Sequence, residues 1–212
     1  MQLLARCCDP TDGAIALHGV NLRHYSLAEI RSTVSFVPRY PLLFSGSIGD
    51  NIAYTRLQVS PDEIVAAAKA VNIHHLIVQN RRGYDVQIGD RGCLLTGSQR
   101  QLIALAREYL NNPRLLILDD PMAMSVDGVD NDVLRAIKLI SRNRTTFVAS
   151  RELDNLAHCD LILRIEHGRL VSVNADVDAA AYVAEALPIQ RHRKSEMRPV
   201  SAVGGTPSSA AC

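Results

Sequence analysis

The chain has no tryptophan and only three phenylalanines, and no apolar run approaches the roughly 20 residues that a membrane-spanning helix needs. We therefore expect a chain that does not cross a membrane by itself. Residues 1–13, MQLLARCCDPTDG, lack a cationic stretch followed by a longer apolar one, so we expect no secretory signal and a cytosolic compartment. The 23 basic and 22 acidic residues nearly cancel, so the charge balance gives no reason to expect nucleic acid as a partner.

The five cysteines are odd in number and include no CxxC pair. This argues against both a disulfide scaffold and a zinc site. We expect free thiols, as in a reducing compartment, at Cys7, Cys8, Cys93, Cys159 and Cys212.

Strand-like and helix-like patterns alternate along most of the chain. Four consecutive apolar residues at 115–118 are typical of a strand covered on both faces, as in parallel sheets. Ser60, Pro61 and Glu63 mark a helix start with a capping box, and that helix should run to about residue 73. Residues 14–17 are expected to form a short strand that turns at Gly19 into a second one, which predicts a hairpin. Further strands are expected at 35–37, 145–149, 161–165 and 170–173. Further helices are expected at 27–34, along the apolar stripe at 102–110 that follows LTGSQ, and around 131–140. The alternation predicts an α/β fold with a mostly parallel sheet, and the Pro-, Gly- and Ser-rich end predicts a disordered tail over 188–212.

Two carboxylates, Asp119 and Asp120, follow the apolar strand directly. In parallel sheets ligands bind beyond the carboxyl ends of the strands, so both residues stand where a bound metal or phosphate would lie. The alternative is that one aspartate caps the following loop and the other pairs with a cation.

Four segments, in order, resemble the nucleotide-binding domain of ATP-binding cassette (ABC) transporters, particularly the exporter type. They contain LLARCCDPTDG, VPRYPLLF, GYDVQIGDRG and RTTFVASREL, and the resemblance covers most of residues 2–187. It implies a partial P-loop-NTPase-like cassette over 1–187, with a helical subdomain at about 55–110 and with ATP and Mg as ligands. It also implies two partners at the cytoplasmic face of a membrane: a second cassette, in a homodimer or heterodimer, and a transmembrane domain on a separate or preceding polypeptide.

By this resemblance Asp119 matches the Walker B aspartate that helps hold magnesium, and Asp120 stands where a glutamate usually polarises the attacking water. Aspartate is shorter by one carbon–carbon bond, about 1.5 Å, so Asp120 should be a weak general base. Asp127 matches a further aspartate of the nucleotide site, but the connection PMAMSVD is one residue longer than usual, which alters the expected loop.

A second motif, LTGSQ, resembles the family's signature motif at a helix start, where backbone amides and the helix dipole can face the ATP of a partner cassette. It comprises Leu95, Thr96, Gly97, Ser98 and Gln99. Thr96 keeps the hydroxyl that serine usually supplies. Ser98 replaces a glycine and adds a side chain where close approach is needed, so the contact should be weakened. The alternative is that Thr96 only caps the helix.

Two arginines depart from the family pattern. Arg39 takes the place of a glutamine that reaches magnesium and the attacking water, and a guanidinium has no acceptor atom and repels a metal cation. Arg151 replaces a histidine that contacts the terminal phosphate. Arginine can bind phosphate, but it cannot transfer a proton at neutral pH.

The sequence contains no GxxxxGKS or GxxxxGKT motif, which is the phosphate-binding P-loop. Losing three charged phosphate contacts of about 1.5 to 3 kcal/mol each weakens ATP binding by roughly three to six orders of magnitude. We therefore expect the cassette component of an ABC exporter, coupling ATP binding and hydrolysis to transmembrane transport, that is inactive as an isolated chain. Two alternatives remain: a degenerate cassette that acts as a regulatory binding module, and a decayed gene product without a stable fold.

Overall fold

The computed structural model describes residues 1–56, 58–124 and 131–175. The chain divides into two units, residues 1–159 and residues 160–212, and each is described by itself. Two predicted features, Asp127 and the tail over 188–212, lie outside the described residues.

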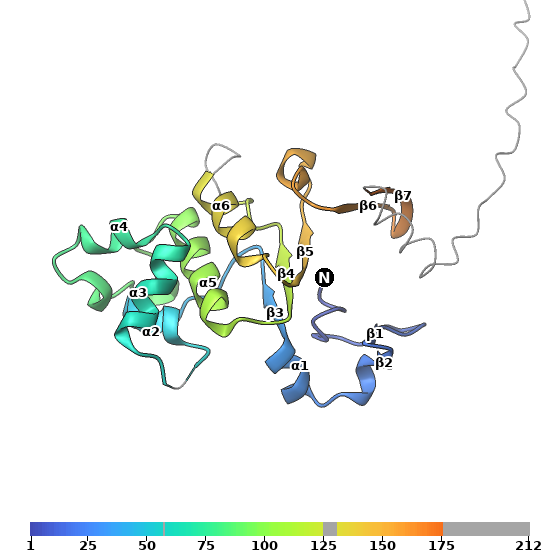
Figure 1. Cartoon of the computed structure of the whole chain (residues 1–212), viewed down its shortest axis with the longest axis horizontal. Coiled ribbons are helices and arrows are strands. Elements are labelled where there is room, and N and C mark those ends of the chain that lie inside the picture. Colours follow the sequence, from blue (N-terminus) through green and yellow to red (C-terminus); the bar gives the residue numbers. More distant parts are fainter. Residues whose placement is uncertain (57, 125–130, 176–212) are drawn as a thin grey trace, which may run out of the picture. The chain divides into compact units, whose positions relative to one another are not determined.

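The first unit contains a three-stranded parallel sheet, as the sequence predicts (Figure 1). Its strands, in spatial order, are β3 (Val34–Val37), β4 (Leu115–Asp119) and β5 (Thr145–Ala149). The central strand is covered on both faces. Leu116 and Leu118 pack into one apolar cluster, and Ile117 packs into another on the opposite face. All three side chains are fully buried, which explains why the strand has no polar alternation.

Six α-helices occur in the described part of the first unit. They are α1 (Leu27–Thr33), α2 (Ile48–Ala53), α3 (Pro61–Ala70), α4 (His74–Val78), α5 (Gly97–Asn111) and α6 (Asn131–Ile140). Four of them begin with a complete capping box, in which a serine or threonine hydroxyl and the side chain three residues later each bond the other's amide. The predicted cap at Ser60 is confirmed. The predicted end of that helix near residue 73 is wrong, because Asn72 adopts a left-handed backbone with φ 60° and the helix ends at Ala70.

The main apolar core lies where α2, α3 and α6 pack against α5, and α4 adds to it through its contact with α3 (Figure 1). Ile52, Ala67 and Ile103 are fully buried there, one from each of α2, α3 and α5. A smaller core, on the other face of β4, joins Ile117 to Leu22 and to α1. The hairpin predicted around Gly19 is confirmed: β1 (Ala16–Leu17) and β2 (Val20–Asn21) pair antiparallel, although the first strand is shorter than the predicted 14–17.

The second unit consists, in its described part, of an antiparallel hairpin formed by β6 (Leu161–Glu166) and β7 (Arg169–Ala175). Both strands were expected from the sequence, but the parallel arrangement holds only for the three strands of the first unit. No helix in the described ranges is long and apolar enough to pass through a membrane.

Candidate functional site

The carboxyl ends of β3, β4 and β5 lie along one edge of the parallel sheet. Val37 is paired with Leu118, and Leu118 with Val148, so the three strands end in register. Four of the residues predicted to form a site follow these strand ends: Arg39 after β3, Asp119 and Asp120 at the end of β4, and Arg151 after β5. The central strand therefore ends in two carboxylates, and each of the two outer strands is followed by an arginine.

The backbone of Asp120 is held on both sides. Its amide donates a hydrogen bond to the Ala149 carbonyl at 2.9 Å, and its own carbonyl accepts one from the Ala123 amide at 3.1 Å. The residue has φ 47°, in the left-handed region, which aspartate tolerates better than most residues. These contacts fix the direction in which the chain leaves β4, and with it the position of the carboxylate.

The Asp120 carboxylate forms an ion pair with Arg39, with 3.4 Å between Nη1 and Oδ2. The Asp120 side chain is 17% exposed and that of Arg39 is 35% exposed, so the pair lies partly out of water. The Arg39 guanidinium also lies over the Tyr40 ring, 5.5 Å from its centroid. The sequence left open that one of the two aspartates pairs with a cation. In the structure Asp120 does so, with Arg39.

The predicted signature residues form the start of α5. Thr96 is the N-cap: its Oγ1 accepts from the Gln99 amide at 3.2 Å, and its own amide donates to Gln99 Oε1 at 3.0 Å. The Thr96 hydroxyl therefore serves the helix cap, as the alternative interpretation proposed. A helix of 15 residues still presents the positive end of its dipole at this point, which favours an anion.

Gly97 places the start of α5 against the turn that follows the acidic pair. A methyl group added at its Cα would lie 2.6 Å from the Met124 carbonyl oxygen and 2.8 Å from the Met124 Cβ. Such distances leave no room for any side chain. The glycine therefore brings the predicted signature helix into direct contact with a segment only four residues after Asp120, a proximity that sequence spacing did not reveal.

Arg107 is a further residue that the sequence analysis missed. From α5 it donates hydrogen bonds to the Asn51 carbonyl at 3.0 Å, to Asn51 Oδ1 at 3.3 Å and to the Leu42 carbonyl at 3.2 Å. It also lies against the stacked rings of Phe44 and Tyr54. The segment that follows Arg39 is thus held against α2 and α5. An arginine within an otherwise apolar helix stripe is the signal that could have identified it.

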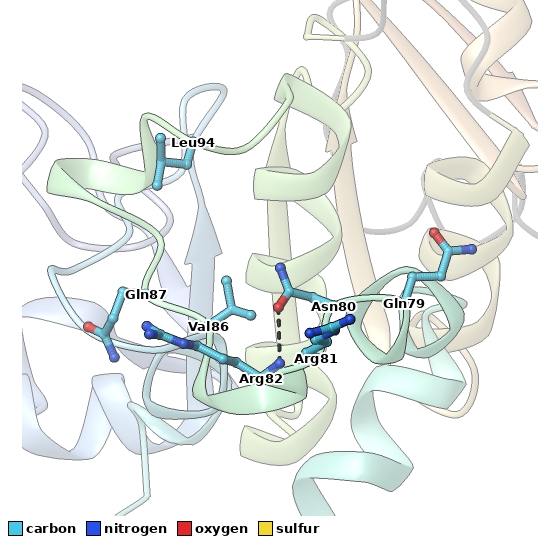
Figure 2. Close-up of a pocket in the computed structure, with 7 residues that line it drawn as sticks. All are labelled: Gln79, Asn80, Arg81, Arg82, Val86, Gln87 and Leu94. Carbon is cyan, nitrogen blue, oxygen red and sulfur yellow. Dashed lines mark hydrogen bonds between the residues drawn. The ribbon is translucent and has the colours of Figure 1, made fainter.

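A surface hollow of about 580 Å³ lies in another part of the first unit. Arg81 and Arg82 both line it, and the Arg82 amide donates to Asn80 Oδ1 at 3.0 Å (Figure 2). The lining holds two guanidinium groups, three side-chain amides and no carboxylate, from Gln79, Asn80, Arg81, Arg82, Val86, Gln87 and Leu94. No residue of the predicted site lines it, so the hollow is separate from the acidic edge.

The fold and the edge define an α/β cassette whose polar residues gather at the carboxyl ends of parallel strands. Residues 1–123 match the family model described as ABC transporter, which is more than half of the chain. The chain therefore belongs to the ABC transporter family.

Similar proteins agree with this assignment. The chain is 37% identical over 172 residues to a multidrug efflux ATP-binding/permease protein of Mycobacterium bovis and, to the same extent, to one of Mycobacterium tuberculosis. Each match covers 81% of this chain and 14% of the relative. A solved structure of a bacterial Atm1-family ABC exporter with ATP bound matches with a TM-score of 0.76 and 31% identity, over 88% of this chain and 34% of that one. The chain thus spans about a seventh of those relatives and a third of the exporter.

Cassettes of this family bind ATP with Mg, and the residues at the edge of the sheet fit a magnesium ion only in part. Asp119 is a suitable oxygen ligand at the end of a buried strand. The neighbouring carboxylate is paired with a guanidinium, which has no lone pair for a metal. A magnesium ion at this edge would therefore find one carboxylate ligand, Asp119, next to the positive charge of Arg39.

Proposed function

We propose that this chain is the ATP-binding-cassette component of an ABC exporter, coupling ATP binding and hydrolysis to transmembrane transport. It would act at the cytoplasmic face of a membrane, through a transmembrane partner on a separate or preceding polypeptide. Membership of the ABC transporter family and the likeness to an Atm1-family exporter support the proposal.

The observation that carries the proposal is the start of α5. Within LTGSQ, Thr96 caps a 15-residue helix that begins at Gly97. The Thr96 and Gln99 amides are used in the capping box, so the helix dipole and the amides of Gly97 and Ser98 are what suits a phosphate here. Within the proposal, this turn contacts ATP held mainly by a second cassette. Ser98 leaves less room for a phosphate to approach the backbone, because it adds a side chain in the first turn of the helix.

We further propose that the chain by itself does not hydrolyse ATP. No P-loop motif is present in its sequence to hold the phosphates. Asp119 would contact Mg and Asp120 would be a weak base, because its carboxylate is short and is paired with Arg39. Arg151 would bind phosphate without transferring a proton. Asp127, outside the described residues, keeps its proposed part in the nucleotide site.

The Arg39–Asp120 ion pair favours one second candidate, a non-catalytic cassette that regulates a partner. A base that is neutralised by a neighbouring guanidinium is of little use for activating water, whereas docking on a partner without nucleotide does not require a base. The third alternative, a decayed gene product, predicts no cooperative unfolding transition, which circular dichroism during urea denaturation would reveal.

The test of the proposed function is ATP-dependent association. The purified chain is mixed with an exporter cassette that has a P-loop, and complex formation is followed by sedimentation velocity with and without ATP. ATP should increase association, and Ser98→Glu should abolish that increase by placing a negative charge against the phosphates. Gln79→Glu adds the same charge at the separate surface hollow and should have no effect.

Two results would count against the proposal. Association that does not change with ATP would favour the regulatory module. ATP hydrolysis by the isolated chain with magnesium, lost in Asp119→Asn, would show that the proposed inactivity is wrong.

A further inference from the structure

We propose that Arg39 is a built-in cation that closes the acidic edge of this cassette to divalent metal ions in the absence of nucleotide. The inference rests on the proposed function only in treating this edge as the nucleotide site. Magnesium is expected there from the family, and the disagreement between that expectation and the Arg39–Asp120 ion pair leads to the inference.

The topology of the sheet brings the two residues together. Arg39 lies two residues beyond Val37, and Asp120 lies two residues beyond Leu118, which is the register partner of Val37 in the neighbouring strand. Parallel neighbours therefore deliver both side chains to the same edge, and the 3.4 Å contact between Nη1 and Oδ2 follows from this placement.

The carboxylate has little freedom to move away from the guanidinium. Backbone hydrogen bonds to Ala149 and from Ala123 hold Asp120 in a left-handed conformation on both sides of its Cα. Arg39 is held as well, since its guanidinium lies over the Tyr40 ring. The pair is therefore better defined than an exposed ion pair between two long, mobile side chains.

A metal ion at this edge would meet a positive charge in place of a ligand. The guanidinium only donates hydrogen bonds and keeps its charge at all accessible pH values, so neither a change of tautomer nor loss of a proton can make room for a cation. A glutamine at position 39 would instead offer a neutral carbonyl oxygen. Asp119 alone, without a second carboxylate or bound phosphates, is a poor site for Mg²⁺ or Mn²⁺.

The experiment measures binding of Mn²⁺ alone to the full chain, by electron paramagnetic resonance of the free ion. Wild type should bind weakly, and Arg39→Gln should bind at least about tenfold more tightly, because it removes the repulsion of one unit charge close to a divalent ion. Arg39→Lys keeps the charge and should remain weak. In the Arg39→Gln background, Asp120→Asn should remove the gain.

Arg56→Gln is the matched control for net charge. It also removes one arginine from an ion pair, with Glu63 at 3.0 Å, and should leave Mn²⁺ binding unchanged. Thermal unfolding of each variant verifies that it is folded.

Equal Mn²⁺ affinity in wild type and Arg39→Gln would overturn the inference, as would equally tight binding by Arg39→Lys. Neither result depends on ATP-promoted association with a second cassette. Failure of this inference can therefore be distinguished from failure of the proposed function.

Discussion

Replacing Gly97 with alanine tests the contact that joins the signature helix to the turn after the acidic pair. Alanine in place of glycine within a helix ordinarily stabilises by up to about 1 kcal/mol. Here the new methyl group would lie 2.6 Å from the Met124 carbonyl oxygen, a backbone atom that cannot rotate away. Forcing an extra methyl group into such a contact typically costs about 1 to 3 kcal/mol. With a clash near the middle of that range, about 2 kcal/mol, and a propensity gain of up to about 1 kcal/mol, we expect a net loss of about 1 to 2 kcal/mol.

Gly49 provides a matched control. It also lies in the first turn of a helix and also faces a backbone carbonyl oxygen, that of Tyr84, but a methyl group there would be 3.4 Å away, an ordinary contact. Gly49→Ala should therefore be neutral or stabilising by up to about 1 kcal/mol. The two variants differ in one quantity, the space in front of the new methyl group.

The assay is urea denaturation followed by circular dichroism at 222 nm, with thermal unfolding as a second measure. For a chain of this size about 1 kcal/mol corresponds to 2–4 °C, so Gly97→Ala should lower the Tm by about 2 to 8 °C. The reasoning is refuted if Gly97→Ala is as stable as wild type, or if Gly49→Ala loses as much stability as Gly97→Ala.

Three further predictions concern the caps and the buried charges. Thr96→Ala should lower the free energy of unfolding by about 0.5 to 2 kcal/mol in urea denaturation, whereas Thr96→Ser keeps the cap and should match wild type. Arg107→Lys should cost about 1.5 to 3 kcal/mol in the same assay, because one ammonium group cannot reproduce the bonds of the guanidinium to Leu42 and Asn51; a variant as stable as wild type would contradict this. Burial raises the pKa of Glu108 above its ordinary value, although hydrogen bonds from Ser35 and Asn111 oppose the shift. Because its pKa is raised in the folded state, the proton on Glu108 stabilises the fold at acid pH, and this stabilisation is lost as the pH rises through the folded pKa. Wild type should therefore lose stability relative to Glu108→Gln from pH 4 towards 7. A constant difference between the two would show that Glu108 is not involved.

Local signals in the sequence were enough to predict most of the secondary structure. The strand at 145–149 and the helix at 131–140 have the bounds that the sequence predicted, because apolar periodicity and flanking polar residues define both within a few positions. The end of α3 was missed because the apolar pattern runs on through Val71 and Ile73, although Asn72, a residue type that favours the left-handed conformation after a helix, marks the end. The antiparallel pairing of β6 and β7 was missed as well, although the two residues that connect them, His167 and Gly168, allow only a hairpin, since both have positive φ and parallel strands need a long connection.

For the candidate site, the sequence by itself determined which residues reach the edge of the sheet. Asp119 and Asp120 directly follow an unmistakable buried strand, and the arginines follow two other strand ends, so their types and approximate positions are local properties of the chain. Only the tertiary structure decided what they contact. The Arg39–Asp120 pair joins residues 81 positions apart (120 − 39), and it exists because β3 and β4 are neighbours in register. The space in front of Gly97 was likewise decided by how the turn at Met124 packs against α5. Contacts between distant segments depend on the packing of whole elements, which no local pattern encodes.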